Sequence, residues 1–289
     1  MYHISNGTLR VSIAAKGAEI QSIFHSTYQL EYMWNGDPVF WGKKSPVLFP
    51  IVGGLKNNSY QYNDNTYFLG RHGFAREKLF TVTAQSPNSI QFTIEPDAET
   101  EKVYPFEFRF SVLYTLDEQK LHIKYLVENT GDYAMYFSVG AHPAFAVPLI
   151  PGTNYKDYYL AFNKKETTGK WPLSADGLVE TLSIVVLDNS NVLPLTKELF
   201  HGDALVFKHL HSSSISLLSD KTPHGVKVHF TGFPYMGIWS AKNADFVCIE
   251  PWCGIADSVD TNSELTQKEG IQHLEAGQEF ERSWSIEVF

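Results

Sequence analysis

The feature that most constrains the fold of this chain is an alternation of apolar and polar residues that recurs from end to end. Apolar side chains occupy every second position in segments 9–13, 90–94, 121–127 and 226–230, and with one exception in 280–288. Successive side chains of a β-strand point to opposite faces, so a period of two is typical of strands with one buried face. The sequence therefore predicts a chain built from many strands.

The connections between these segments favour antiparallel pairing. Segment 106–114 alternates in the same way, and after the turn residues 117–120 the segment 121–127 is predicted to be its hairpin partner. Helical periodicity is scarce, with one or two turns expected at 196–201, so the crossover helices that a parallel sheet needs are missing. No linker, charge block or repeat divides the chain. We expect an all-β protein, one large antiparallel β-sandwich with a single domain over residues 1–289.

Composition narrows the possible partners and the compartment. The formal net charge of −9 argues against nucleic acid or an anionic membrane as a partner, because both are bound by positive surfaces. No apolar run approaches the ~20 residues needed to span a bilayer, and residues 1–7 do not resemble a signal peptide. The only two cysteines, Cys248 and Cys253, fit a reducing compartment. The sequence predicts a cytoplasmic protein.

Glu250 is the first candidate for chemistry, because it directly follows the apolar run 246–249 and precedes a proline and Trp252. A strand that ends here would deliver the carboxylate to a rim or cleft, where burial raises its pKa and makes it a usable proton acceptor. A glutamate open to water at the strand end is the plain alternative. Trp252 suits a flat platform for the C–H face of a sugar ring, with core packing as the alternative.

Two further segments combine charged or titratable groups with small neighbours. Segment 70–76 contains Arg71, His72 and Arg76, and guanidinium groups present forked donors suited to hydroxyls, carboxylates or phosphates. An ordinary surface loop is the alternative there. The proline after His142 restricts this histidine to extended conformations, and its imidazole can exchange a proton near neutral pH. A hydrogen-bonded core histidine is the commoner fate of such a residue.

Two single residues complete the set of candidates. Asp203 leads into an apolar segment, where it would either hydrogen-bond a ligand or only begin a strand. Lys56 ends the stretch 41–56, whose aromatics, lysines and paired glycines suit either a pocket wall or a buried strand with basic ends. Phosphate-binding and dinucleotide-binding glycine motifs and the nucleophile elbow are all missing.

Taken in order and spacing, these segments resemble the aldose 1-epimerase (galactose mutarotase) family, especially its bacterial branch typified by the lactose-operon X protein. The most specific marks are Arg71-His-Gly-Phe-Ala-Arg, Gly140-Ala-His-Pro-Ala-Phe and Ile249-Glu-Pro-Trp. The likeness extends from Gly17-Ala-Glu-Ile-Gln-Ser to Leu274-Glu-Ala-Gly-Gln-Glu-Phe, nearly the whole chain. It implies an antiparallel β-supersandwich that binds a sugar on a concave open face.

The resemblance also implies roles for individual residues. His142 matches the general acid, Glu250 the general base, His72 a second active-site histidine, and Asp203 the aspartate that holds sugar hydroxyls. Arg76 matches the arginine of the His-Gly-Phe-Ala-Arg motif in the hexose-phosphate branch.

The match is weaker at two further positions, Arg71 and the turn around Lys56. Arg71 is a less certain contact to the substrate. True galactose mutarotases have Gly-Arg-x-x-Asn-Arg where residues 53–58 read Gly-Gly-Leu-Lys-Asn-Asn, so Lys56 is the stand-in for an arginine there. The difference puts specificity for galactose in doubt.

The implied activity is that of an isomerase that interconverts the α and β anomers of a hexose. A base removes the proton of the C1 hydroxyl while an acid protonates the ring oxygen, each group contributing roughly 10²–10⁴ in rate. We expect ionised Glu250 and protonated His142, with pKa values near neutrality. The reaction needs no metal, cofactor or covalent intermediate.

Three alternatives stay open. A hexose-6-phosphate mutarotase would use Arg71, Arg76 and Lys56 to hold the phosphate. A carbohydrate-binding or sensing protein would keep the fold without turnover. His72, His142 and Glu250 would also suit a metal site of two histidines and one carboxylate. The sequence specifies neither which sugar is bound nor the oligomeric state.

Overall fold

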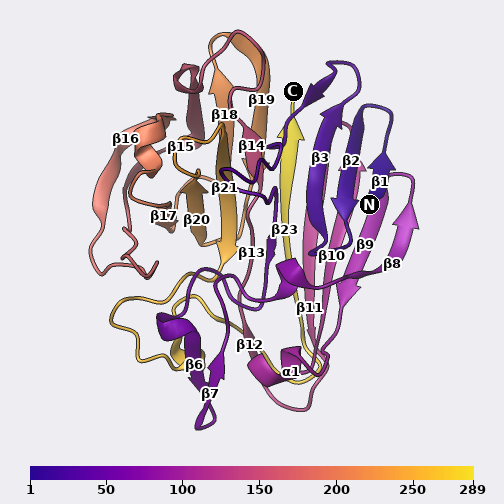
Figure 1. Ribbon diagram of the computed structural model, residues 1–289, viewed down its shortest axis with the longest axis vertical. Coiled ribbons are helices and arrows are strands. Elements are labelled where there is room, and N and C mark those ends of the chain that lie inside the picture. The colour runs from indigo at the N-terminus through magenta and orange to yellow at the C-terminus, as the bar shows by residue number, and fades with distance from the viewer.

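The computed structural model describes residues 1–289, and nearly all of its regular structure consists of antiparallel strands (Figure 1). The only α-helix, α1, covers Thr100–Val103, and the 3-10 turns are Lys56–Asn58, Ala75–Glu77, Tyr155–Asp157, Lys197–Phe200 and Leu265–Gln267. The predicted all-β class and antiparallel pairing are confirmed. No helix has the length and apolar character required to cross a membrane.

A nine-stranded sheet forms one layer of the molecule. Its strands are, in spatial order, β16 (Ile184–Pro194), β15 (Tyr158–Lys170), β18 (Ser214–Ser219), β19 (Thr222–His229), β23 (Glu279–Val288), β11 (Lys120–Asn129), β10 (Phe108–Asp117), β9 (Ser89–Ile94) and β8 (Thr81–Ser86). The predicted hairpin is confirmed: β10 and β11 pair from Phe108–Asn129 to Asp117–Lys120. The alternating apolar side chains of both strands face the same buried side, whereas Leu113 and Leu126 lie on the opposite face and are half-buried.

Two smaller sheets cover this layer, one beside the other (Figure 1). The four-stranded one contains β1 (Tyr2–Ser5), β2 (Leu9–Ala14), β3 (Glu19–His25) and β4 (Leu30–Glu31). The six-stranded one contains β17 (Leu205–Lys208), β20 (Tyr235–Trp239), β21 (Phe246–Cys253), β13 (Val139–Ala141), β5 (Val47–Leu48) and β14 (Ala144–Ala146). Two-stranded pairs, β6 (Ser59–Tyr62) with β7 (Asn65–Phe68) and β12 (Met135–Phe137) with β22 (Gln272–Leu274), extend the lower end.

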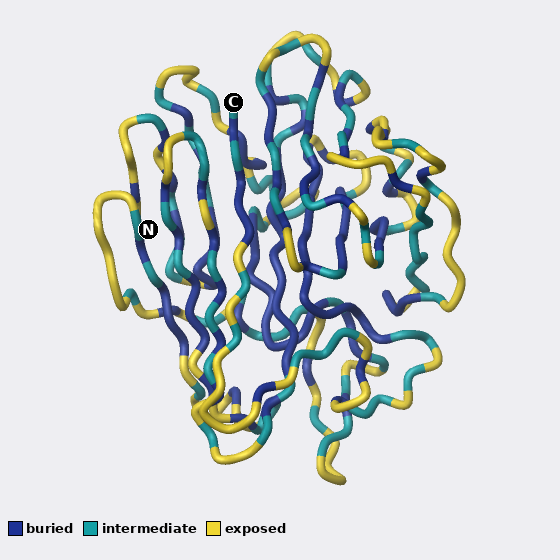
Figure 2. Tube along the Cα trace, turned by 180° about the vertical axis from the view of Figure 1, so that it is seen from behind, coloured by how far each residue is buried: buried dark blue, intermediate teal, exposed yellow.

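Aromatic side chains join the layers into one core. Phe49 stacks on Phe110 with ring centroids 4.5 Å apart, and the Tyr114 hydroxyl donates to the Ala18 carbonyl at 2.6 Å. The main hydrophobic cluster has members from near both ends of the chain, including Ile4 and Val288. Buried segments run through the strands and exposed ones lie at the connecting loops (Figure 2). The sandwich thus supplies a rigid base for one open sheet face.

The central strand β21 departs from the sequence expectation. Glu250 was expected to end its strand, but β21 continues through Pro251 to Cys253 and is buried along its whole length. It pairs with β20 through Tyr235–Trp252 and with β13 through Val139–Cys253. The physical reason is that pairing with β20 on one edge and with β13 on the other keeps the backbone extended past Pro251. The residue before a proline also tolerates this conformation, because it prefers an extended backbone. Glu250 therefore lies in the middle of a sheet and not at its rim.

Candidate active site

A pocket of about 750 Å³ lies over the six-stranded sheet, a volume within the usual range for a small-molecule site. Seven of the eight residues singled out in the sequence line it: Arg71, His72, Arg76, His142, Asp203, Glu250 and Trp252. Lys56 does not line it, because its ammonium group donates to the Val259 carbonyl at 2.9 Å outside the pocket. Lys242 does line the pocket, although no sequence motif marks it.

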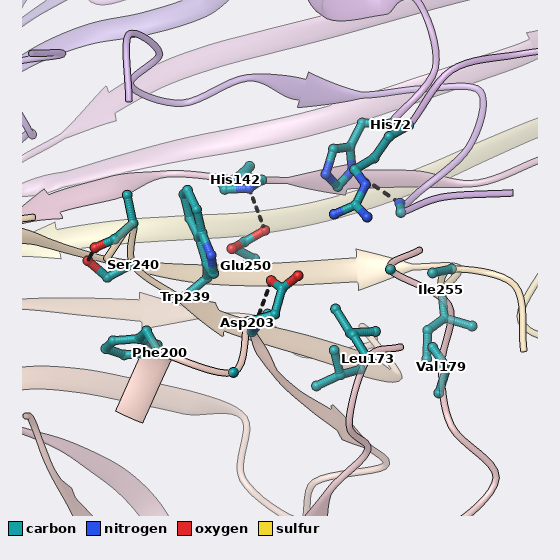
Figure 3. A pocket seen from close by; sticks show the side chains of 18 of the residues that line it. His72, His142, Leu173, Val179, Phe200, Asp203, Trp239, Ser240, Glu250 and Ile255 are labelled. Atoms are coloured by element: carbon teal, nitrogen blue, oxygen red, sulfur yellow. Dashed lines mark hydrogen bonds and ion pairs between the residues drawn. The ribbon is translucent and has the colours of Figure 1, made fainter. Parts of the chain in front are cut away.

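His142 and Glu250 are brought together by strand register. β13 and β14 pair with the same edge of β21 in one continuous register, from Val139–Cys253 to Ala144–Cys248. This register puts His142 opposite Glu250 in the gap between β13 and β14. Directly opposed residues of antiparallel strands have neighbouring side chains, and here His142 Nε2 lies 3.2 Å from Glu250 Oε2 (Figure 3). Two motifs distant in the sequence thus bring an imidazole and a carboxyl group into contact.

Burial shifts the pKa values of this pair in opposite directions and reverses their ordinary order. Desolvation raises the pKa of Glu250 well above 4.5, the nearby Asp203 charge adds to the rise, and Trp252 opposes it. Desolvation lowers the pKa of His142 to about 3, and the positive charge of Arg76 also lowers it. The sequence predicted pKa values near neutrality, with Glu250 ionised and His142 protonated, and the pKa values in the folded pocket differ from that prediction. Here the uncharged form of each group is favoured.

His72 is held as a neutral hydrogen-bond donor. The Gly53 amide donates to His72 Nδ1 at 3.1 Å, and the His72 amide donates to the Gly53 carbonyl at 2.8 Å. Burial and the positive charges around it keep the pKa of His72 well below 6.5. Because Nδ1 accepts, the proton of the neutral ring resides on Nε2. The His72 ring lies edge-on to that of His142 and can donate to a ligand oxygen, while its Nδ1 lone pair accepts the Gly53 amide.

The arginines of segment 70–76 make a cationic side of the pocket. Arg76 donates through Nη2 to the Arg71 carbonyl at 3.0 Å, and Arg71 donates through Nη2 to the Asp176 carbonyl at 3.4 Å. The Nε atom of Arg76 is buried and has no hydrogen-bond partner in the protein. An unpaired buried donor is costly, so this guanidinium is suited to an anionic or hydroxylated ligand.

Asp203 lies across the pocket, before β17. Its backbone has a positive φ of 76°, and its Oδ1 accepts the amide of Ala204 at 2.7 Å. Figure 3 shows its carboxyl directed toward Glu250. A carboxylate accepts several hydrogen bonds, so Asp203 can also hold hydroxyl groups in the pocket.

Three tryptophans line the pocket, Trp41, Trp239 and Trp252, and Trp252 is the most buried of them. Trp252 is only 6% exposed, its indole N–H donates to the Ala141 carbonyl at 3.2 Å, and its ring occupies the space above Gly237. Trp252 therefore packs the sheet, because close packing leaves little of its face open. Trp41 stacks on the His142 ring with centroids 4.9 Å apart, and Trp239 meets that ring edge-on at 5.5 Å.

Both of these tryptophans line the pocket, and the sequence marks them unequally. Trp41 begins the stretch 41–56 that the sequence offers as a pocket wall. Trp239 carries no sequence motif, and only the pairing of β20 with β21 brings it there. Leu173, Val179 and Ile255 form an apolar side further along (Figure 3).

The side chains near the pair also include potential metal ligands. One donor atom each from His142, Cys248 and Glu250 lies within 4.8 Å of the others. The possible metal site suggested by the sequence consisted of His72, His142 and Glu250. In the structure Cys248, and not His72, is the third potential ligand.

Comparison with known proteins points to one family. The aldose 1-epimerase family matches residues 1–271. The chromosomal LacX protein of Lactococcus lactis subsp. lactis is 33% identical over 99% of this chain and 98% of that protein. A galactose mutarotase related enzyme from Lactobacillus acidophilus is 39% identical, with a TM-score of 0.95 over 100% of this chain and 97% of its own. A galactose mutarotase-like protein from Lactobacillus casei ATCC 334 is 30% identical, with a TM-score of 0.93 and full coverage of both chains.

Proposed function

The chain belongs to the aldose 1-epimerase family, and from this premise we propose that it is a mutarotase that interconverts the α and β anomers of a hexose or related sugar. The observation that carries the proposal is the buried His142–Glu250 pair, with 3.2 Å between Nε2 and Oε2, at a pocket of about 750 Å³. We further propose that the enzyme works in the cytoplasm as a single domain, without a metal or cofactor.

In the proposed reaction, Glu250 takes the proton of the C1 hydroxyl and His142 gives a proton to the ring oxygen. The ring opens, the C1–C2 bond rotates, and the reverse transfers close the ring on its other face. His72 and Asp203 hydrogen-bond the sugar hydroxyls. Trp41 and Trp239 offer faces to its C–H surface.

The pKa shifts of His142 and Glu250 support a particular order of proton transfers between these residues and the sugar. The reactive pair, carboxylate plus imidazolium, differs from the uncharged pair by one proton moved between His142 and Glu250. A C1 hydroxyl that donates to Glu250 favours the carboxylate, so sugar binding promotes the reactive form. Ring opening then leaves both residues uncharged, the state that burial favours. The pocket thereby stabilises the step in which charge disappears from both groups.

One observation favours a phosphorylated substrate as a second candidate. Arg71, Arg76 and Lys242 line one pocket, and the buried Nε of Arg76 has no partner in the protein. A sugar 6-phosphate would supply acceptors for these donors. Arg76→Met should then raise KM for the 6-phosphate much more than KM for the free sugar.

The decisive experiment is a mutarotation assay with chelator-treated protein on anomerically pure sugars and their 6-phosphates. Polarimetry from pure α-anomer should show a rate above the uncatalysed one for at least one compound, unchanged by the chelator. Preference for a 6-phosphate would select the second candidate. Saturable sugar binding without any acceleration would instead identify a carbohydrate-binding protein and refute the proposal.

A further inference from the structure

We propose that His142, Cys248 and Glu250 form a binding site for a thiophilic divalent cation such as Zn²⁺, and that the bound ion inhibits the enzyme. The inhibitory part rests on the proposed function, whereas the binding part does not. The donor set contains a nitrogen, a sulfur and a carboxylate oxygen, all within 4.8 Å of one another and all on buried residues.

The architecture of β21 places these three donors together. Cys248 and Glu250 are two residues apart on one strand, so their side chains point to the same face. His142 lies opposite Glu250 in the register that pairs Ala144 with Cys248. His142 and Cys248 are thus diagonal neighbours, a relation that keeps side chains within reach.

The distances suit tetrahedral coordination after a small adjustment. Ligand bonds of the usual length for Zn²⁺ put nitrogen and oxygen donors about 3.3 Å apart and sulfur and oxygen donors about 3.5 Å apart. His142 Nε2 and Glu250 Oε2 are already separated by 3.2 Å. The cysteine sulfur must close at most a gap of about 1.3 Å, which a side-chain rotation supplies.

A second observation points to a missing ligand at this place. Glu250 is 1% exposed, and apart from the contact of 3.2 Å with His142 Nε2 its Oε2 has no hydrogen-bond partner in the protein. Buried polar atoms in native proteins are normally satisfied. His142 and Glu250 also line the pocket, which leaves one side open for an ion to enter and for a water to complete its coordination.

Charge balance favours a divalent ion over a monovalent one. On binding, the thiol of Cys248 and the carboxyl of Glu250 each release a proton to solvent, and neutral His142 supplies a lone pair. The resulting thiolate and carboxylate neutralise the two positive charges, so no net charge is left in the buried site. Sulfur and nitrogen donors select a thiophilic ion over Mg²⁺ or Ca²⁺.

Inhibition follows from the donors that the ion occupies. The Glu250 oxygen and the His142 nitrogen that bind metal are the atoms that would exchange protons with the sugar. A coordinated carboxylate is a poor proton acceptor, and a coordinated imidazole nitrogen has no proton to give. The ion would therefore stop both halves of the reaction without displacing any part of the fold.

Cys253 offers a matched control for the thiol. It is also a free, buried cysteine on β21. Because it is five residues from Cys248, an odd number, its side chain points to the opposite, core-facing side of the strand. Cys253→Ser therefore removes a thiol and leaves the proposed site intact, whereas Cys248→Ser removes a ligand. Circular dichroism and urea unfolding of both variants, with Cys248→Ala as a second substitution, identify any loss of folding.

The test is a titration of chelator-treated protein with Cd²⁺, followed by its thiolate charge-transfer absorbance, and with Zn²⁺, followed by the mutarotation rate. We expect one thiolate per chain in wild type and Cys253→Ser and none in the Cys248 variants. Each variant is compared with its own metal-free rate. The Zn²⁺ concentration for half-inhibition should rise at least about tenfold in the Cys248 variants, because even outer-shell changes cost 10–100-fold in metal affinity.

The outcomes separate the two proposals. Absence of the thiolate band, or its persistence in the Cys248 variants, would overturn the metal site even if the enzyme is active. A Cys248-dependent band in a protein without mutarotation on any sugar would support the site and refute the proposed function. Acceleration by Zn²⁺ would support binding and overturn its inhibitory role.

Discussion

Replacing Glu250 with glutamine tests the proposed base with little change in shape. Glutamine keeps the length of a side chain that is 1% exposed and 3.2 Å from His142, but it does not accept the proton of a sugar hydroxyl. General-base catalysis is worth roughly 10²–10⁴ in rate, so the catalysed rate should fall by that factor. At 1.36 kcal/mol for each tenfold, the barrier rises by about 2.7–5.4 kcal/mol.

The same substitution should change how folding depends on pH. Burial raises the pKa of Glu250 in the folded protein well above its ordinary 4.5, because the uncharged form is favoured there. Its contribution to stability is therefore fully present below pH 4.5 and is lost as pH rises through the folded pKa. Glutamine does not titrate, so the stability of Glu250→Gln relative to wild type should rise as the pH increases from 4.5 to the folded pKa of Glu250 and should stay level above it.

Two measurements check these expectations together. Mutarotation is followed by polarimetry from pure α-anomer, and the free energy of unfolding is measured in urea at several pH values. Glu118→Gln, at an exposed position, is the matched control and should change neither quantity. Near-normal rates in Glu250→Gln would refute the assignment of the base. A stability difference from wild type that stays constant with pH would refute the buried, proton-holding carboxyl.

Three other perturbations probe the surroundings of the site. Lys268→Met leaves Asp257 buried without its 2.6 Å partner and should lower the free energy of unfolding in urea by about 3–5 kcal/mol; a loss below about 1 kcal/mol would contradict this. His142 has a folded pKa of about 3 against 6.5 unfolded, so it contributes stability above pH 6.5 that is lost as pH falls through 3. Between pH 7 and pH 3, the free energy of unfolding of His142→Gln should therefore fall by less than that of wild type. An equal fall in both proteins would contradict a buried neutral ring. Gly237→Ala puts a Cβ 2.3 Å from the Trp252 ring and should destabilise the protein by about 1–3 kcal/mol in the same urea assay; an unchanged free energy of unfolding would contradict the close packing of this ring.

Local patterns in the sequence predicted much of the strand structure. The alternation in 106–114 and 121–127 predicted the hairpin of β10 and β11, since both the period and the turn are encoded within a short stretch. The end of β21 was predicted wrongly, because Pro251 reads locally as a stop while its neighbours in the sheet keep the strand extended. Neighbouring strands, which no local pattern reveals, decided this point.

The candidate site was predictable only in part. Motif order and spacing identified His142 and Glu250 as candidates, but Trp239 and Cys248 reach the site through the pairing of β20 and β14 with β21. Lys56 stands in the expected turn, yet its ammonium group turns away to the Val259 carbonyl. The direction of a side chain depends on partners far away in the chain, so spacing alone does not determine it.

By itself, the sequence determined the all-β class, the antiparallel hairpins and the family to which the chain belongs, because periodicity and motif spacing are carried within the chain. Only the tertiary structure decided that β13 and β14 run in one register along β21, which sets His142 opposite Glu250 and beside Cys248. It also decided the pKa directions of the pair, because desolvation depends on what the fold packs around each group. The sequence specifies that a glutamate and a histidine are present at positions 250 and 142, whereas burial in the fold sets their pKa values.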